Sequence, residues 1–571
     1  MGLQDFPPGN MGEIRPANER TSLINVGEYP SRKETWPVIC IILALLLERT
    51  AYYGILANLA LFLKELGFPI DVTVVYVFVF SGMAWMMSTV GGLIGDSYSG
   101  RFHAIWGSLV VYIIGAALLE VTANLATFLY TSDEIRGLVV ALTFIFLSIG
   151  EGGFKANVSA FGAEQLLNHD GETYRRFFGW FYWSVNIGSF IGFSLIAWVQ
   201  VQYNFKIGYS LPLGCLVCSI IIFLIPTSKY TVNPLTGNVV TKVYGIVKEA
   251  IVLRKANRRS STCPGLEEVM PIRSWLDRAM CKYGGSYLDS EVLEVKTLGR
   301  ISVMFLMLIP YWMIYYQMNS TFLLQGLHMN LRFNTTFKDT TFTVPAAWLS
   351  LADVTVVLLL IPLMDRVIYP WLDKKGYNLS LNKRISIGFV FAIASMCAAG
   401  VVENERKKVS GPPIFQCING QNYSAADMNI FYQVPQYGLI GISEVFASVG
   451  CLEFAYREAP ESMHGFVMGL FYLVVSVASL LGAGLYAFSS NVLHWTTSPG
   501  KTSTDLGSDL DLYFFLLGGI LFVTWLIFIV VSVRYNYRSG NRSSKSKKYS
   551  RLTSGERWNT SASQSNSIMT L

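Results

Sequence analysis

The chain has 571 residues, of which 52% are hydrophobic and only 14% charged, whereas soluble proteins carry about 25% charged residues. This composition excludes an ordinary soluble protein and predicts an integral membrane protein. The net charge of +6 lies mostly in polar loops and tails, and no basic-aromatic patch stands apart, so nucleic acid is not an expected partner.

Apolar segments of about 20 residues recur between polar breaks, and each can cross a bilayer only as a helix. In chain order they cover 36–63, 72–95, 104–121, 138–161, 177–200, 209–227, 296–328, 346–364, 385–402, 433–454, 465–488 and 512–533. They predict an all-α integral membrane protein with twelve transmembrane helices in two pseudo-symmetric six-helix bundles.

The polar stretches between these segments predict the domain organisation. We expect a cytosolic tail at 1–35, a bundle at 36–227, a cytosolic linker loop at 228–295, a second bundle at 296–533 and a cytosolic tail at 534–571. Pseudo-symmetric halves of this kind hold a substrate at their interface near the midplane and expose it alternately to each side.

The distribution of Lys and Arg predicts the orientation, because cytosolic loops carry the excess of basic residues. The tail after residue 533 and the loop at 365–384 are basic, and Arg406, Lys407 and Lys408 depart from the trend. Asn334 and Asn422 begin N-x-[ST] sequences in predicted luminal loops, which makes them candidate glycosylation sites.

Charged residues within the apolar segments are the strongest functional signal. They are Glu48, Arg49, Glu151, Lys155, Asp353, Glu444 and Glu453. A charge at the centre of a spanning helix costs about 2.5–3.5 kcal/mol, so it normally faces a partner or a water-filled cavity on a substrate or proton path. Glu48, Arg49 and Tyr52 can point into one cavity from a single helical face. The pattern predicts a transporter.

Several of these charges also have a structural interpretation. Glu151 precedes Lys155 by four residues, the favourable order for a helical ion pair, so Lys155 could be a buried structural charge. Glu453 lies nine residues from Glu444, on the opposite face of an unbroken helix, which favours a packing role. Asp353 could be a satisfied contact between helices.

A short motif lies between the second and third segments. Residues 91–96 read Gly-Gly-Leu-Ile-Gly-Asp and are followed by Arg101. This resembles a loop of the major facilitator superfamily, in which small residues permit close packing and an Asp/Arg pair locks one conformation. The resemblance implies that role for Asp96 and Arg101.

A longer pair of motifs lies in and after the fourth segment. Residues 154–165 read Phe-Lys-Ala-Asn-Val-Ser-Ala-Phe-Gly-Ala-Glu-Gln, and residues 177–189 read Phe-Phe-Gly-Trp-Phe-Tyr-Trp-Ser-Val-Asn-Ile-Gly-Ser. Together they resemble the signature of the proton-coupled oligopeptide transporter family, and residues 48–54 resemble its first-helix motif. Residues 309–318 and 433–448 are similar to the peptide/histidine transporter branch.

The resemblance implies roles for individual residues. Arg49 would bind the substrate carboxylate through its fork of donors, unless it is a structural anchor. Lys155 would help to bind that carboxylate and couple the proton, and Glu444 would hold the substrate ammonium. Glu48 and Glu444 would take up protons. Further residues implied to line the site are Tyr52, Tyr53, Asn186, Tyr315 and Tyr316.

The same resemblance implies substrates and location. Histidine and di- or tripeptides would move with protons, without another cofactor or a metal, out of acidic endolysosomes. Glu19, Leu23 and Ile24 have the spacing of a dileucine sorting signal. Tyr549 and Leu552 fit a tyrosine-based signal, so sorting adaptors are expected partners.

Three positions depart from the family pattern. Leu45 stands where the family usually has a second glutamate, Phe78 where animal dipeptide carriers have a histidine, and Tyr316 where many relatives have an acid. Weakened coupling at Leu45 leaves open a second function, a ligand-sensing scaffold that recruits cytosolic signalling partners. An enzyme is not expected, since no nucleophile–base pair, metal cluster or phosphate-binding loop is found.

Overall fold

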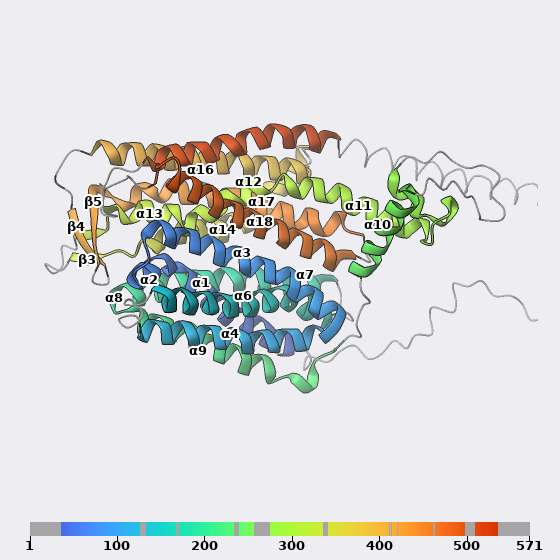
Figure 1. The fold of residues 1–571 in the computed structure, drawn as a ribbon, viewed down its shortest axis with the longest axis horizontal. Coiled ribbons are helices and arrows are strands. Elements are labelled where there is room, and N and C mark those ends of the chain that lie inside the picture. Colours follow the sequence, from blue (N-terminus) through green and yellow to red (C-terminus); the bar gives the residue numbers. More distant parts are fainter. Residues whose placement is uncertain are drawn as a thin grey trace, which may run out of the picture.

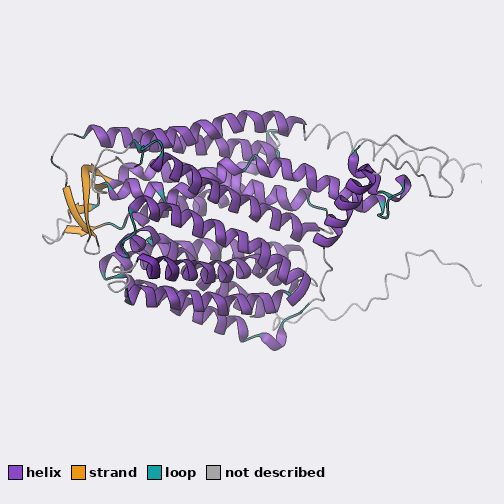
Figure 2. Cartoon of the chain, viewed as in Figure 1, coloured by secondary structure: helices purple, strands orange, loops and turns teal. Residues whose placement is uncertain are grey.

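The computed structural model describes residues 36–125, 133–166, 171–232, 239–255, 274–334, 341–377, 379–409, 412, 414–418, 421–460, 463–496 and 509–534. Long helices lie side by side, and short strands gather at one end of the molecule (Figures 1 and 2). We call that end the sheet end and the opposite end, which carries α10 (Val239–Lys255), the linker end.

The first half of the chain forms the N half. Its helices are α1 (Trp36–Ala57), α2 (Leu59–Glu65), α3 (Ile70–Ile94) with a π-helical turn η3 (Gly95–Ser99), α4 (Arg101–Asn124), α6 (Asp133–Glu164), α7 (Gly171–Ile191) with a π-helical turn η4 (Gly192–Ile196), α8 (Ala197–Gln202) and α9 (Phe205–Leu224). A short 3₁₀ turn, η5 (Thr227–Lys229), follows.

The second half forms the C half. Its helices are α11 (Asp289–Leu306), α12 (Ile309–Tyr315), η8 (Tyr316–Asn319), α13 (Thr321–Leu327), η9 (Ala346–Leu349), α14 (Ser350–Leu363), η10 (Met364–Ile368), α15 (Tyr369–Lys374), α16 (Leu381–Lys408), η11 (Ile430–Gln433), α17 (Val434–Glu458), α18 (His464–Asn491) and a final helix, Leu510–Arg534.

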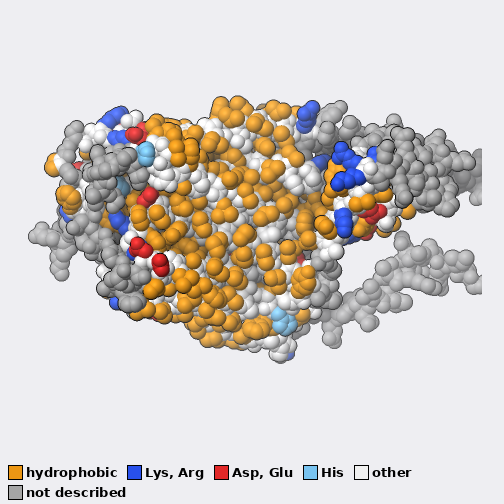
Figure 3. Space-filling model, in the orientation of Figure 1, with side chains coloured by type: hydrophobic (Ala, Val, Ile, Leu, Met, Phe, Trp, Pro, Cys, Tyr) orange, Lys and Arg blue, Asp and Glu red, His pale blue; other side chains and the backbone are white. Residues whose placement is uncertain are grey.

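Hydropathy agrees with a chain that crosses the membrane many times. Among the described residues, eleven helices are long and apolar enough to span it, and hydrophobic side chains cover the middle of the face shown in Figure 3. The expected span 296–328 is instead divided into α11, α12, η8 and α13. Pro310 near the start of α12 contributes to this division, because it cannot donate to the helical ladder.

Two small sheets lie where the sequence predicted loops. In one sheet β1 (Met329–Asn330) pairs in parallel with β5 (Gln421–Asn429), which pairs antiparallel with β4 (Ile414–Ile418). In the other, β2 (Arg332–Asn334) pairs antiparallel with β3 (Thr341–Thr343). β1 directly follows α13 and β5 directly precedes η11, so the first sheet connects these helical segments.

The linker range 228–295 contains helix as well as loop. Helix α10 packs against η6 (Trp275–Ala279), which is followed by η7 (Cys281–Tyr283). Ile246 and Ala250, four residues apart on α10, are buried. Lys242 on α10 and Glu291 on α11 form an ion pair of 2.7 Å, so this linker segment is attached to the C half.

Glycines permit close contacts between helices of the N half. A Cβ at Gly91 on α3 would lie 2.5 Å from the Cα of Gly153 on α6, and a Cβ at Gly152 would lie 2.6 Å from the backbone of Ser88. The glycines of the Gly-Glu-Gly-Gly run at 150–153 therefore form a packing surface on α6 against α3 and α4.

The two halves contact one another at several places. Helices α3 and α18 pack along their length, and the Ser476 and Ser479 hydroxyls donate to carbonyls of α3 at 2.7 Å each. At the sheet end, the Lys64 ammonium lies 3.8 Å from the centroid of the Tyr423 ring. The indole of Trp348 donates to the Ser194 carbonyl at 3.0 Å. The contacts of Lys64 and Trp348 therefore join the two halves at the sheet end.

Candidate functional site

Helix α1 supplies one wall of the candidate site because α7 approaches it closely. A Cβ at Gly188 would lie 2.8 Å from the Cβ of Arg49, and a Cβ at Gly192 would lie 2.8 Å from the backbone nitrogen of Gly54. Gly192 begins the π-helical turn η4, a kind of irregularity that often marks functional sites. Glycines on α7 and η4 thus set the position of the charged face of α1.

Four charged side chains form a cluster in the N half, which we call the ion-pair cluster: Glu48, Arg49, Glu151 and Lys155. The Arg49 guanidinium donates to Glu48 at 2.6 and 2.7 Å and to Glu151 Oε1 at 3.2 Å. The Lys155 ammonium lies 3.3 Å from the same Oε1. Both glutamates have no exposed side-chain surface, and Arg49 has 4%.

Aromatic rings surround the two cations of the ion-pair cluster. The Lys155 nitrogen lies 2.9 Å from the centroid of a Trp85 ring and 6.0 Å from that of Tyr52, and the Arg49 guanidinium lies 5.1 Å from Tyr52. Cation–π contacts of this kind strengthen when they are removed from water. The N half therefore presents two partly desolvated cations that two carboxylates balance.

A cavity, which we call the central cavity, lies between the halves. It is lined by Tyr53, Asn186, Ser189, Phe193, Tyr315, Met318, Asn319, Ser350, Asp353, Val354, Val357 and Glu444. Two carboxylates from the C half, Asp353 on α14 and Glu444 on α17, therefore share one cavity. Ser189, Asn319 and Ser350 were not singled out from the sequence, although the polar run at 319–321 was a usable signal.

Asp353 lies in this cavity and also against α17. A Cβ at Gly441 would stand 3.0 Å from Asp353 Oδ1, and Glu444 is three residues further along the same helical face. Asp353 Oδ1 is buried and has no hydrogen-bond partner among the described residues. Asp353 therefore lines the cavity with one carboxylate oxygen that the contacts between the described helices do not satisfy.

Tyr53 belongs to both parts of the site. It follows Arg49 by four residues, one turn along α1, and lines the central cavity together with Glu444. Its ring centroid lies 5.2 Å from that of Tyr52. Tyr315 and Glu444 both line the central cavity. The amide nitrogen of Asn186 donates to the Tyr182 carbonyl at 3.0 Å, which orients the side chain at the cavity wall.

The remaining aromatic candidates pack around these groups. Tyr316 is buried and meets Tyr315 edge-on with ring centroids 5.7 Å apart. Trp85, which was not singled out from the sequence, lies 6.5 Å from Trp312 across the two halves. The feature of the sequence that could have identified Trp85 is the presence of a tryptophan within the second apolar segment.

Other residues singled out from the sequence lie elsewhere. Glu453 forms ion pairs with Arg384 at 3.2 Å and with Arg457 at 3.1 Å. Arg101 pairs with Asp96 at 2.9 Å and also with Glu164. These contacts are outside the central cavity.

The positions that depart from the family pattern are apolar or aromatic core positions. Leu45 is 2% exposed and Phe78 1% exposed.

Asn334 ends β2 and Asn422 lies in β5, both at the sheet end. The sorting-signal residues of both tails lie outside the described residues.

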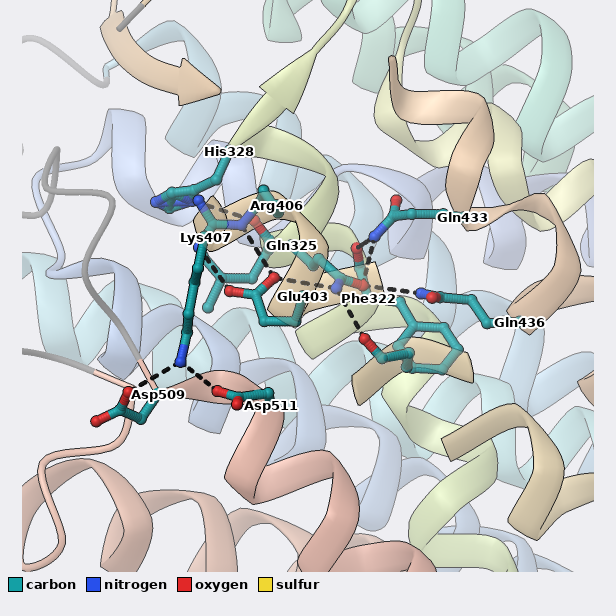
Figure 4. A network of polar contacts seen from close by, with 12 residues as sticks. Phe322, Gln325, His328, Glu403, Arg406, Lys407, Gln433, Gln436, Asp509 and Asp511 are labelled. Atoms are coloured by element: carbon teal, nitrogen blue, oxygen red, sulfur yellow. Dashed lines mark hydrogen bonds and ion pairs between the residues drawn. The ribbon is translucent and has the colours of Figure 1, made fainter. Parts of the chain in front are cut away.

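A separate polar group, the sheet-end network, joins several helices of the C half (Figure 4). The Glu403 carboxylate accepts hydrogen bonds from Arg406 at 2.5 and 3.0 Å and from Gln325 at 3.0 Å. Gln325 Oε1 in turn accepts from Gln433 at 2.7 Å and Gln436 at 3.0 Å. The network therefore connects α13, α16, η11 and α17.

Comparisons of the sequence and of the structure with known proteins point to the same family. The POT family model matches residues 102–500. Solute carrier family 15 member 3 from Rattus norvegicus is 32% identical, over 91% of this chain and 95% of its own. Protein NRT1/ PTR FAMILY 8.5 from Arabidopsis thaliana is 30% identical, over 89% and 92%.

Solved structures show the same fold. An auto-inhibited POT family peptide transporter superposes with a TM-score of 0.66 at 20% identity, covering 87% of this chain and 97% of its own. A POT family transporter in complex with 5-aminolevulinic acid gives 0.62 at 18% identity, covering 87% and 96%. The chain therefore belongs to the POT family and is a multi-pass membrane transporter, not an enzyme.

Proposed function

We propose that the protein is a proton-coupled symporter that moves histidine and di- or tripeptides from the endolysosomal lumen to the cytosol by alternating access. The observation that carries this proposal is that the two cations of the site lie in the N half, whereas two further carboxylates line the central cavity from the C half. The N half supplies Arg49 and Lys155, and the C half supplies Glu444 and Asp353. An amino acid or short peptide has a carboxylate and an ammonium, which match these two sets of groups.

The chemistry of each end of the substrate agrees with this placement. A guanidinium matches a carboxylate through two parallel donors, so Arg49 is suited to the substrate carboxylate. The carboxylate of Glu444 is suited to the substrate ammonium. Tyr53, which lines the central cavity one helical turn after Arg49, would contact the part of the substrate between its charged ends.

The second acid of the central cavity supports histidine as a substrate. With Glu444 on the ammonium, Asp353 is available for another cationic group, such as a protonated imidazole. The buried Oδ1 of Asp353 has no hydrogen-bond partner among the described residues, and an imidazolium N–H would satisfy it. A neutral side chain would leave that oxygen unsatisfied.

The proposed direction depends on the sheet end facing the lumen. The sequons at Asn334 and Asn422 lie at this end, and the basic loop at 365–384 lies in the other direction along α14 and α16. The candidate sorting signals support an endolysosomal membrane. The contacts of Lys64 and Trp348 would then close the luminal side of the substrate path.

Uptake into proteoliposomes tests the proposal directly. Labelled histidine and a labelled dipeptide are offered with and without an inwardly directed acid gradient, to the wild type, Arg49→Ala and the matched control Arg457→Ala. Arg457 is mostly exposed and pairs only with Glu453 among the described ion pairs. We expect gradient-stimulated uptake in the wild type and the control, and a loss of about 10-fold or more in Arg49→Ala, because charge-assisted hydrogen bonds contribute about 1.5–3 kcal/mol.

A ligand-sensing scaffold is the second candidate, and the linker supports it. Tyr244, Val252 and Trp275 are exposed on α10 and η6, where a cytosolic partner could dock. Saturable binding of histidine without gradient-stimulated uptake would overturn the symporter proposal in favour of this function.

A further inference from the structure

Glu151 is the shared carboxylate of the ion-pair cluster. Its Oε1 alone contacts both cations, at 3.2 Å to Arg49 and 3.3 Å to Lys155. Glu48, by contrast, uses both of its oxygens on Arg49, at 2.6 and 2.7 Å. Glu151 is thus held by longer contacts and occupies the space between the two cations.

The other oxygen of Glu151 shows that the group is not optimally satisfied. Oε2 is buried and has no hydrogen-bond partner among the described residues, and the side chain has no exposed surface. A buried ion pair stabilises a fold only when its geometry is good and its remaining lone pairs are satisfied. Packing alone therefore does not explain this arrangement well.

The charge of the cluster limits what can bind to it. Two acids balance two cations, so a substrate carboxylate would add a third acid to a buried group that is already neutral. An uncompensated buried charge is expensive. One of the three acids must then be protonated, and Glu151 is the one that lies where a carboxylate would meet both Arg49 and Lys155.

Other charged and titratable groups around Glu151 come from five elements. They are Glu48, Arg49, Tyr52 and Tyr53 on α1, Lys155 on α6 itself, Tyr112 on α4, Tyr316 on η8 and Tyr472 on α18. The tyrosines are neutral near pH 7. Within this set, only Glu48 and Glu151 are acids that can compensate a third carboxylate by taking up a proton.

We propose that Glu151 is an internal competitor of the substrate carboxylate. A proton from the solution on the acidic side binds Glu151, its contacts to Arg49 and Lys155 break, and the substrate carboxylate takes its place between them. When the substrate leaves, Glu151 releases the proton and contacts both cations again. The inference rests on the proposed function and gives it a mechanism in which proton and substrate bind together, even though position 45 is a leucine.

Equilibrium binding of a labelled dipeptide to the purified full-length protein tests this role. Binding is measured at pH 5.5 and 7.5 for the wild type, Glu151→Gln and the matched control Glu453→Gln. We expect the wild type and the control to bind at least about 10-fold more weakly at pH 7.5, since one required proton gives up to tenfold per pH unit. Glu151→Gln should bind within about twofold of the acidic wild-type affinity at both values.

The opposite result is equally clear. If Glu151→Gln keeps the wild-type pH dependence, or binds more weakly at both values, Glu151 does not compete with the substrate. Glu151→Asp serves as a second variant that keeps the charge but reaches less far toward both cations. It should bind more tightly than the wild type at pH 7.5, and weaker binding would overturn the inference.

A measurement without substrate separates this inference from the proposed function. If the wild type binds neither histidine nor dipeptide at either pH, the proposed function fails. The unfolding temperature of the ligand-free protein still reports on Glu151, because protonation breaks its contacts to both cations. We expect a fall on acidification from pH 7.5 to 5.5 that is smaller in Glu151→Gln than in Glu453→Gln, and equal falls would overturn the inference.

Discussion

The Glu403–Arg406 pair provides a sharp test of how this fold is stabilised. The two side chains are 0% and 2% exposed, and the Glu403 carboxylate accepts three hydrogen bonds, two from Arg406 and one from Gln325. Breaking a buried pair by removing one partner costs about 3–5 kcal/mol. Glu403→Ala should therefore destabilise the C half by about that amount.

Thermal unfolding in detergent, followed by intrinsic fluorescence, measures this effect. For a domain of about 150–250 residues, 1 kcal/mol lowers the unfolding temperature by about 2–4 °C, so we expect a fall of roughly 6–20 °C. The matched control is Glu405→Ala on the same helix. Glu405 pairs with Lys408, and both side chains are more than half exposed, so its removal should cost no more than about 1 kcal/mol.

A double-mutant cycle then tests the reason for the effect. Arg406→Ala and Glu403→Ala are each expected to destabilise the protein, and the double variant should lose less than their sum by about 1–3 kcal/mol, because it buries neither charge. If the two losses add within about 0.5 kcal/mol, the side chains are energetically independent and the reasoning is refuted.

Three further predictions concern packing, pH and orientation. Gly91→Ala should lower the free energy of unfolding by about 1–3 kcal/mol, because the added Cβ meets the Gly153 backbone. An unchanged unfolding temperature would contradict this prediction. The control is Gly107→Ala, where the added Cβ meets open space. Burial lowers the pKa of Lys64 to about 8, below about 10.4 in an unfolded chain. Between these two pKa values the unfolded state binds more protons than the folded state, so the free energy of unfolding should rise with pH from about 8 to about 10.4. Parallel pH profiles of unfolding for the wild type and Lys64→Met would exclude this contribution of Lys64. Asn422→Gln should remove a glycosidase-sensitive gel shift if the sheet end is luminal, and an unglycosylated wild type would argue against that orientation.

The sequence predicted the helical spans and the charged face of α1 well. Length and hydropathy suffice for the spans, and helical spacing suffices to place Glu48, Arg49 and Tyr52 on one face. The spacing of Glu151 and Lys155 indicated their ion pair on α6. It could not show that Arg49, 102 residues away in sequence, contacts the same oxygen.

Other features depend on tertiary contacts that sequence patterns do not encode. From the sequence alone, Asp353 fits a contact between helices and a ligand-binding group equally well, because the position of α17 beside it is not known. The strands at the sheet end are short, and β1 and β5 pair across about 100 residues of sequence. Helix α10, in contrast, does have a signal in the sequence, because Ile246 and Ala250 are apolar residues at helical spacing. The polar residues around them made this signal hard to recognise.

The basic residues that depart from the expected charge distribution have a physical explanation. Lys407 forms ion pairs with Asp509, at 2.9 Å, and with Asp511. Arg406 contacts Glu403. Basic side chains that form ion pairs with acids on the same side of the membrane need not indicate a cytosolic loop. A count of Lys and Arg alone therefore gives such residues too much influence on the predicted orientation.

The pairing of β1 with β5 has a consequence for the transport cycle that we expect of the C half. β1 extends from α13 and β5 leads into η11 and α17, and the amide of Ala426 donates to the His328 carbonyl at 3.0 Å. The two segments are thus hydrogen-bonded to one another at the sheet end, and we expect them to move together. Tyr315 and Glu444 would travel together through a transport cycle, and the displacement between them would be smaller than that between Lys64 and Tyr423 on opposite halves.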